Sequence, residues 1–120
     1  MTGKLFLQPV AIAALALAPT AASAQTAANT TLTQAQVDKI MNDTCSLSAK
    51  YAADVAASKG QPRDIYSRWA YQILTSNISI PKLQQMLDVA TKLGAEGNKA
   101  EQDVSDFQYC VLINKINYIK

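Results

Sequence analysis

Residues 33–58 read TQAQVDKIMNDTCSLSAKYAADVAAS, and this stretch decides the fold class. Thr33 and Gln36 have the spacing of a capping box, in which each side chain bonds the other residue's backbone N–H at the start of a helix. Apolar residues then recur every three or four positions, which is the period of one helix face. The pattern predicts a single helix from Thr33 to about Ser58. Its buried face is expected to carry Val37, Ile40, Met41, Leu47, Tyr51 and Val55.

Cys45, inside this stretch, and Cys110 are the only two cysteines of the chain. If the chain is exported, the expected state is one disulfide that joins the first helix of the domain to the last. A bridge between positions 65 residues apart would stabilise a fold by about 4 kcal/mol in the chain-entropy description. Two free buried thiols, or a disulfide between two copies, are the alternatives.

The first 24 residues have the pattern of a cleavable secretion signal. Lys4 supplies a positive charge, residues 5–17 are apolar, and residues 22–24 (Ala-Ser-Ala) fit the small-x-small cleavage pattern. We expect removal of residues 1–24 and a periplasmic product without stable membrane insertion; a retained membrane anchor is the alternative. Residues 25–32 are small and polar, which predicts a flexible N-terminal tail before a helical domain over residues 33–120.

Turn-forming residues divide the rest of the chain. Gly60 is placed to end the first helix, and Pro62 suits the first turn of a second helix that runs to about Thr75. Ser79 is a candidate N-cap for a third helix, which Gly94 would end.

The last helix is expected to run from Lys99 or Asp103 to about Lys120. Its apolar residues do not resolve into one face, which indicates burial on two sides or a surface for a partner. The predicted fold is therefore all-α: a small single-domain bundle of about four helices, braced by one disulfide.

Composition excludes several classes of function. The chain has 11 basic and 9 acidic residues, a formal net charge of +2, without a basic stripe, so nucleic-acid binding has no electrostatic support. It has no histidine, which removes Ser-His and Cys-His catalysis and the usual zinc sites. Asp103 and Asp106 lack the dense oxygen pattern of a calcium loop. We expect a protein that is not an enzyme and that holds no metal or cofactor.

Two features remain as candidates for binding. Trp69, the only tryptophan, is expected to be a core anchor, and contact with a partner is the alternative. Residues 92–102 are interpreted as a loop: either an ordinary solvated connection or a protruding element that reaches into a partner's cleft. The candidate binding residues of this loop are Lys92, Gly94, Glu96, Gly97, Asn98, Lys99 and Glu101.

Three motifs together carry a family resemblance. Thr44-Cys45 is followed by alanines and Tyr51, Trp69 comes 24 residues after Cys45, and residues 107–110 read Phe-Gln-Tyr-Cys. Over about residues 37–120 this resembles the periplasmic amidase immunity proteins of the type VI secretion system, type-four group.

The resemblance implies a function and a set of roles. It implies an all-helical homodimer that binds a secreted papain-like peptidoglycan amidase tightly and inhibits it by placing a loop in the substrate cleft. On this reading Cys45 and Cys110 form the structural bridge, Trp69 and Phe107 lie in the core, and residues 92–102 are the inhibitory element.

A second hypothesis is a small acid-stress chaperone of the two-cysteine helical periplasmic type, which exposes apolar surface when acid dissociates its dimer. An enzyme, or a lysozyme inhibitor of another fold, is a minor third possibility.

Overall fold

The computed structural model describes residues 30–119, which contain five α-helices and no β-strand. The all-α prediction is confirmed, but the count is five rather than four because the first predicted helix is divided. The predicted signal peptide and Lys120 lie outside the described residues. The helices are α3 (Gln34–Asp43), α4 (Ser46–Ser58), α5 (Ile65–Thr75), α6 (Ile80–Glu96) and α7 (Lys99–Tyr118).

Thr44 and Cys45 separate α3 from α4. The backbone N–H of Thr44 donates to the carbonyl oxygen of Ile40 at 3.0 Å, and its hydroxyl donates to the same oxygen at 2.8 Å. The N–H of Cys45 also turns to this oxygen, at 3.1 Å, so the regular helical hydrogen bonds stop here. A threonine side chain that bonds the preceding turn in this way competes with helix continuation.

The division changes which side of α4 is buried. Cys45, Ala52 and Ala56 are at most 1% exposed, whereas Leu47 and Tyr51 are 62% and 46% exposed. The prediction that Leu47 and Tyr51 continue the buried stripe is therefore wrong, because α4 restarts with a new phase. The other members of the predicted stripe are buried: Val37, Ile40, Met41 and Val55.

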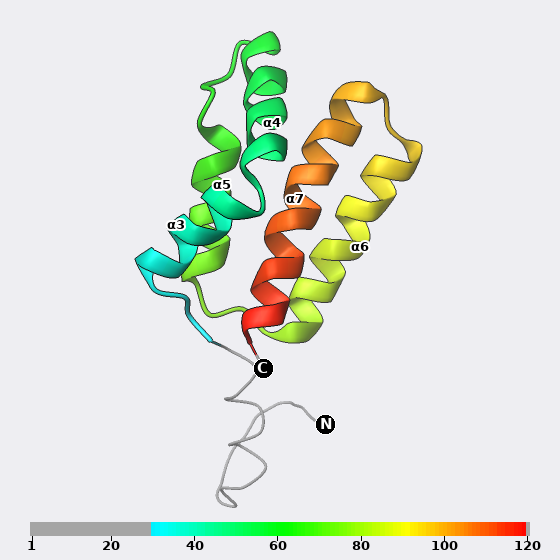
Figure 1. Ribbon diagram of the computed structural model, residues 1–120. Coiled ribbons are helices and arrows are strands. Elements are labelled where there is room, and N and C mark those ends of the chain that lie inside the picture. The colour runs from blue at the N-terminus through cyan, green and yellow to red at the C-terminus, as the bar shows by residue number, and fades with distance from the viewer. Residues whose placement is uncertain (1–29, 120) are drawn as a thin grey trace, which may run out of the picture.

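α7 is the central helix of the bundle. It lies between α6 on one side and α4 and α5 on the other (Figure 1). Neighbours on several sides explain why its apolar residues do not form one face. Phe107 is fully buried at its centre, and truncation of such a residue to alanine costs about 3–5 kcal/mol. The other buried side chains of α7 are Val104, Ser105, Val111, Leu112 and Lys115.

The turns follow the predicted chemistry at Gly60 and Ser79 but not at Pro62. Gly60 has a φ of +74°, the left-handed conformation that a glycine after a helix supplies. Ser79 caps α6 by accepting a hydrogen bond from the N–H of Lys82. Pro62, however, lies in the turn before α5 rather than in its first helical turn, and its carbonyl accepts from the N–H of Ile65.

The segment before α3 packs against the end of α5. Leu32 is 3% exposed, and its N–H donates to the carbonyl oxygen of Leu74 at 3.3 Å. Thr31 and Asn77 are joined by a side-chain hydrogen bond. The predicted flexible tail therefore does not extend through Leu32, whereas residues 25–29 are outside the described span. Within residues 30–119, none of the helices combines the length and apolar character needed to cross a bilayer.

Candidate functional site

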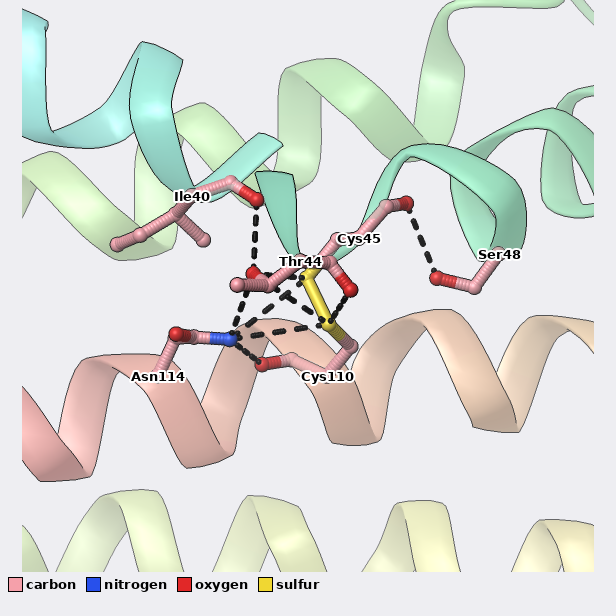
Figure 2. The surroundings of a disulfide bond; sticks show 6 residues. All are labelled: Ile40, Thr44, Cys45, Ser48, Cys110 and Asn114. Atoms are coloured by element: carbon pink, nitrogen blue, oxygen red, sulfur yellow. Dashed lines mark hydrogen bonds between the residues drawn. A yellow bond between two sulfur atoms is a disulfide. The ribbon is translucent and has the colours of Figure 1, made fainter. Parts of the chain in front are cut away.

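The predicted disulfide joins Cys45 at the start of α4 to Cys110 in α7, with 5.9 Å between the two Cα atoms. Figure 2 shows Thr44 and Asn114 beside it. The side-chain amide of Asn114 donates to the carbonyl oxygen of Cys110 at 2.8 Å and to the hydroxyl oxygen of Thr44 at 3.1 Å. Both cysteines are oxidised and residues 30–119 hold no other, so this centre is a brace between helices rather than a thiol site.

The predicted binding loop is a short turn. Of residues 92–102, only Gly97 and Asn98 lie outside a helix, because α6 continues to Glu96 and α7 begins at Lys99. Gly94 does not end the third helix: it lies inside α6, and the residue after the helix is Gly97. The structure thus replaces the expected long loop with a helical hairpin, and contact of these residues with a partner stays a prediction.

Gly94 marks the point where α6 and α7 approach closely. A Cβ atom added there would stand 2.6 Å from the hydroxyl oxygen of Ser105 on α7. This hydroxyl donates to the carbonyl oxygen of Ala90 at 2.6 Å. The small residue and the buried hydroxyl together set the distance between the two helices just below the turn.

The turn itself is fixed on both sides. The side chain of Asn98 accepts from the N–H of Glu101 at 2.9 Å, and the Glu101 carboxylate accepts from the N–H of Asn98 at 2.9 Å. This is a complete capping box. Gly97 has no room for a Cβ atom, which would collide with the carbonyl oxygen of Leu93 and the side chain of Glu101. The turn is therefore ordered without a partner.

The predicted binding residues point in different directions around this turn. Lys92, Glu96, Gly97 and Glu101 line a hollow of about 400 Å³ together with Val89 and Leu93. Lys99 instead turns toward α4. Its Nζ lies 2.6 Å from an Asp103 carboxylate oxygen and 5.8 Å from the ring centroid of Tyr51, and the hydrogen bond with Asp103 raises the pKa of Lys99.

Trp69 is half-buried rather than enclosed. It packs against the core and also lines a hollow of about 280 Å³ between α5, α6 and α7. The walls of the hollow include Met86 and Leu112, and Lys82 is its only charged residue. The sequence predicted that Trp69 is a core anchor, with contact to a partner as the alternative. In the structure the side chain both packs against the core and keeps an accessible edge. Phe107 is the core anchor that the resemblance implied.

Sequence reasoning missed Lys115, which is fully buried in α7. Its Nζ donates to three backbone carbonyl oxygens: Thr30 at 2.8 Å, Leu74 at 3.0 Å and Ser76 at 2.8 Å. Burial lowers the pKa of Lys115. The three acceptors match the three protons of an ammonium group, and two of them carry the partial negative charge of the α5 C-terminus. One feature of the sequence does indicate its burial. Lys115 lies four residues after Val111 and four before Ile119, so it shares a helix face with two apolar residues.

No cluster of three or more His, Cys, Asp or Glu side chains suited to a metal ion occurs among the residues that the structure describes. No family model, curated protein or solved structure matches the chain.

Proposed function

We propose that the chain is an exported immunity protein that binds a secreted papain-like peptidoglycan amidase and blocks its active-site cleft. The spacing of Cys45, Trp69 and Cys110 supports the proposal through the family resemblance. The disulfide is consistent with an oxidising compartment, and the periplasm is the one that the proposal requires. In this role the chain acts by occupying space and needs no catalytic group of its own.

The observation that carries the proposal is the rigid turn between α6 and α7. Its capping box and the close contacts of Gly97 fix the backbone before any partner binds. A pre-ordered element loses little conformational entropy on binding, so more of its contact energy becomes affinity. A narrow helical hairpin that ends in two non-helical residues has the form needed to enter a cleft.

The side chains around the turn would define its fit to the enzyme. Lys92, Glu96 and Glu101 border the hollow beside it and mix both signs of charge. Mixed charges at the rim of an interface favour one register of docking over others. The contact is therefore expected to depend on these side chains as well as on the turn's shape.

The test is inhibition of a candidate amidase, first of all one encoded beside this chain. The mature chain should form a stable complex with the enzyme, abolish peptidoglycan hydrolysis and protect cells that express the enzyme in the periplasm. A double variant, Lys92→Ala with Glu101→Gln, should weaken inhibition about 10-fold or more while the glutamine keeps the capping acceptor.

Lys50→Ala on the exposed side of α4 is the matched control and should inhibit like the wild type. An amidase that is neither bound nor inhibited by the folded chain would refute the proposal. If the double variant still inhibits the amidase, the proposed function stands, but the contact with the enzyme lies elsewhere than at the turn.

The acid-stress chaperone is a second candidate because the surface carries large exposed apolar side chains, among them Leu47, Tyr51 and Tyr109. Acid acts by neutralising carboxylates, but the charged side chain that is buried within residues 30–119 is Lys115, which acid leaves protonated. Among the four ion pairs within residues 30–119, three have carboxylates that are at least half exposed, so protonation of these carboxylates costs little stability. These properties favour the immunity role.

Aggregation of an acid-labile client enzyme separates the two candidates. As an immunity protein, the chain should leave client aggregation unchanged at about pH 2–3, where carboxylates are protonated. Suppression of aggregation together with binding of a hydrophobic dye by the acidified chain would instead support the chaperone.

A further inference from the structure

The hollow beside Trp69 has apolar walls from three helices. Trp69 comes from α5, Met86 from α6 and Leu112 from α7. Leu112 is only 1% exposed, so this wall is part of the packed core, whereas Trp69 and Met86 are half-buried and keep accessible surface. Side chains on three packed elements give the hollow a fixed shape before anything binds to it.

Three polar side chains border the same hollow. Lys82 and Gln85 come from the first two turns of α6, and Gln108 comes from α7. Neither glutamine carboxamide forms a hydrogen bond with another residue of the span 30–119, although Gln108 is half-buried. An apolar hollow with a few polar groups at its border is the usual form of a site for a small ligand.

The charge at this hollow is positive and has no partner. Lys82 is the only charged residue among the described residues of the lining, and it belongs to none of the four ion pairs within residues 30–119. It also stands in the first turn of α6, where the helix dipole is positive. A negative group is therefore attracted both by the ammonium group and by the helix, and a second cation is repelled.

We propose that this hollow binds a small monocarboxylate with a compact apolar body. The carboxylate pairs with Lys82, the amides of Gln85 and Gln108 supply further hydrogen-bond donors, and the apolar body packs against Trp69 and Met86. One cation with neutral amide donors matches a single negative charge, whereas phosphate is typically held by arginine forks or by several backbone N–H groups.

The size of the hollow sets the size of the ligand. Its volume of about 280 Å³ is close to the lower end of the range for small-molecule sites, which is about 300–1,000 Å³. A single aromatic ring or a short acyl chain fits such a volume, and a peptide segment does not. The occupant is therefore a small molecule rather than the chain of another protein.

This site is separate from the turn that we propose for amidase inhibition. Lys82 lies near the start of α6 and Glu96 at its end, about 21 Å apart along the helix, and the turn follows Glu96 (Figure 1). Within residues 30–119, Val89 is the only residue that borders both hollows, and none of the proposed contacts uses it. Binding of a carboxylate is therefore independent of whether the chain inhibits an amidase.

Trp69 reports on the site directly, because it is the only tryptophan of the chain. Titration of the mature, oxidised chain with phenylbutyrate should change the tryptophan fluorescence in a saturable way, with a dissociation constant of about 1 mM or tighter. Phenylbutanol has the same apolar body without the charge and should bind about 10-fold more weakly. Phenylbutylamine, which carries a positive charge instead, should bind more weakly still.

Variants separate the contribution of the charge from that of the apolar walls. Lys82→Met keeps an apolar stem without the ammonium group, so it should raise the dissociation constant of phenylbutyrate about 10-fold and change that of phenylbutanol less than about threefold. Gln108→Leu should weaken phenylbutyrate about fivefold. Lys50→Met is the matched control on the exposed side of α4 and should bind both probes like the wild type. Circular dichroism establishes that each variant is folded.

Three results would overturn the proposal. One is the absence of a saturable fluorescence change up to about 10 mM phenylbutyrate. Another is equal binding of phenylbutyrate and phenylbutanol, or of phenylbutyrate by the wild type and folded Lys82→Met. The third is a short peptide with a C-terminal phenylalanine that binds more than about 10-fold more tightly than phenylbutyrate, because the occupant would then be the C-terminus of a protein.

Discussion

The two sides of α7 are held by different means. On one side α6 reaches α7 through a turn of two residues, and the helices pack along their length around Gly94 and Ser105 (Figure 1). On the other side α4 meets α7 across 65 positions of sequence, and a disulfide joins them.

Loop-closure entropy explains the difference. Neighbouring helices meet at little entropic cost, because the chain between them is short. Helices far apart in sequence must restrict a long chain before their contacts form, and a covalent bridge offsets part of that cost by restricting the unfolded state too. The α6–α7 side should therefore depend on local side chains and the α4–α7 side on long-range bonds.

The largest test of this contrast removes the bridge. Cys110→Ser should lower the free energy of unfolding by about 4 kcal/mol, measured by urea denaturation of the mature chain. Hydrogen exchange should accelerate more in α4 than in α6, because only α4 loses its tie to α7. Reduced wild-type protein should match the variant. Equal stability of the oxidised wild type and Cys110→Ser would contradict the proposed role of the bridge.

The next test removes the buried cation that links α7 to α5 and the N-terminal segment. Lys115→Met keeps the length of the side chain but removes the donor to the carbonyl oxygens of Thr30, Leu74 and Ser76, of which Leu74 retains the N–H of Leu32; this should cost about 3 kcal/mol. The N–H of Leu32 should exchange faster, while the α6–α7 turn stays protected. Lys50→Met is the exposed control, with an expected change below about 0.5 kcal/mol.

The turn between α6 and α7 offers a purely local test. Gly97→Ala should destabilise the fold by about 2 kcal/mol, because its Cβ meets the backbone oxygen of Leu93 and the side chain of Glu101. Faster exchange should be confined to the ends of α6 and α7. Wild-type stability in this variant would show that the turn has more space than described.

A smaller effect is expected for the cap of α7. Asn98→Ala removes the acceptor for the N–H of Glu101 and should cost about 1 kcal/mol, whereas Asn98→Asp keeps an acceptor and should cost less. Thermal unfolding of both variants measures the difference. Equal losses in the two variants would mean that the cap does not stabilise the turn.

The smallest effect concerns pH. Since burial lowers the pKa of Lys115 below its ordinary 10.5, the unfolded chain binds this proton more tightly than the folded chain does. The free energy of unfolding should therefore contain a contribution that rises with pH between the folded value and 10.5. Denaturation at several alkaline pH values should show this slope in the wild type and not in Lys115→Met.

The contrast between local and long-range interactions also separates the features that the sequence could predict from those that it could not. The capping of α3 and α6 and the left-handed Gly60 depend on neighbouring residues, so local patterns predicted them. The division at Thr44 was hidden, because helix-forming residues continue on both sides of it. Burial of Lys115 runs against the general exposure of lysine and depends on three carbonyls brought together by the tertiary fold.

Among the candidate binding residues, some features were predicted correctly and others were not. The sequence left the start of the last helix at either Lys99 or Asp103, and α7 begins at Lys99. The length of the loop was predicted wrongly, because Gly94 was interpreted as a helix end. In the structure Gly94 instead allows α6 and α7 to approach closely. Exposure of Leu47 and Tyr51 could not be predicted without the break that changes the phase of α4.

The bridge between Cys45 and Cys110 also determines how the protein would respond to mechanical force. Tension applied to the two ends of the chain would travel through α3, cross the sulfur atoms and leave through the last turns of α7. Residues 46–109 would carry no tension, so stretching would release only the short segments outside the covalent ring. In single-molecule pulling, the oxidised protein should therefore gain far less length than the reduced protein, and the turn between α6 and α7 should stay folded under load.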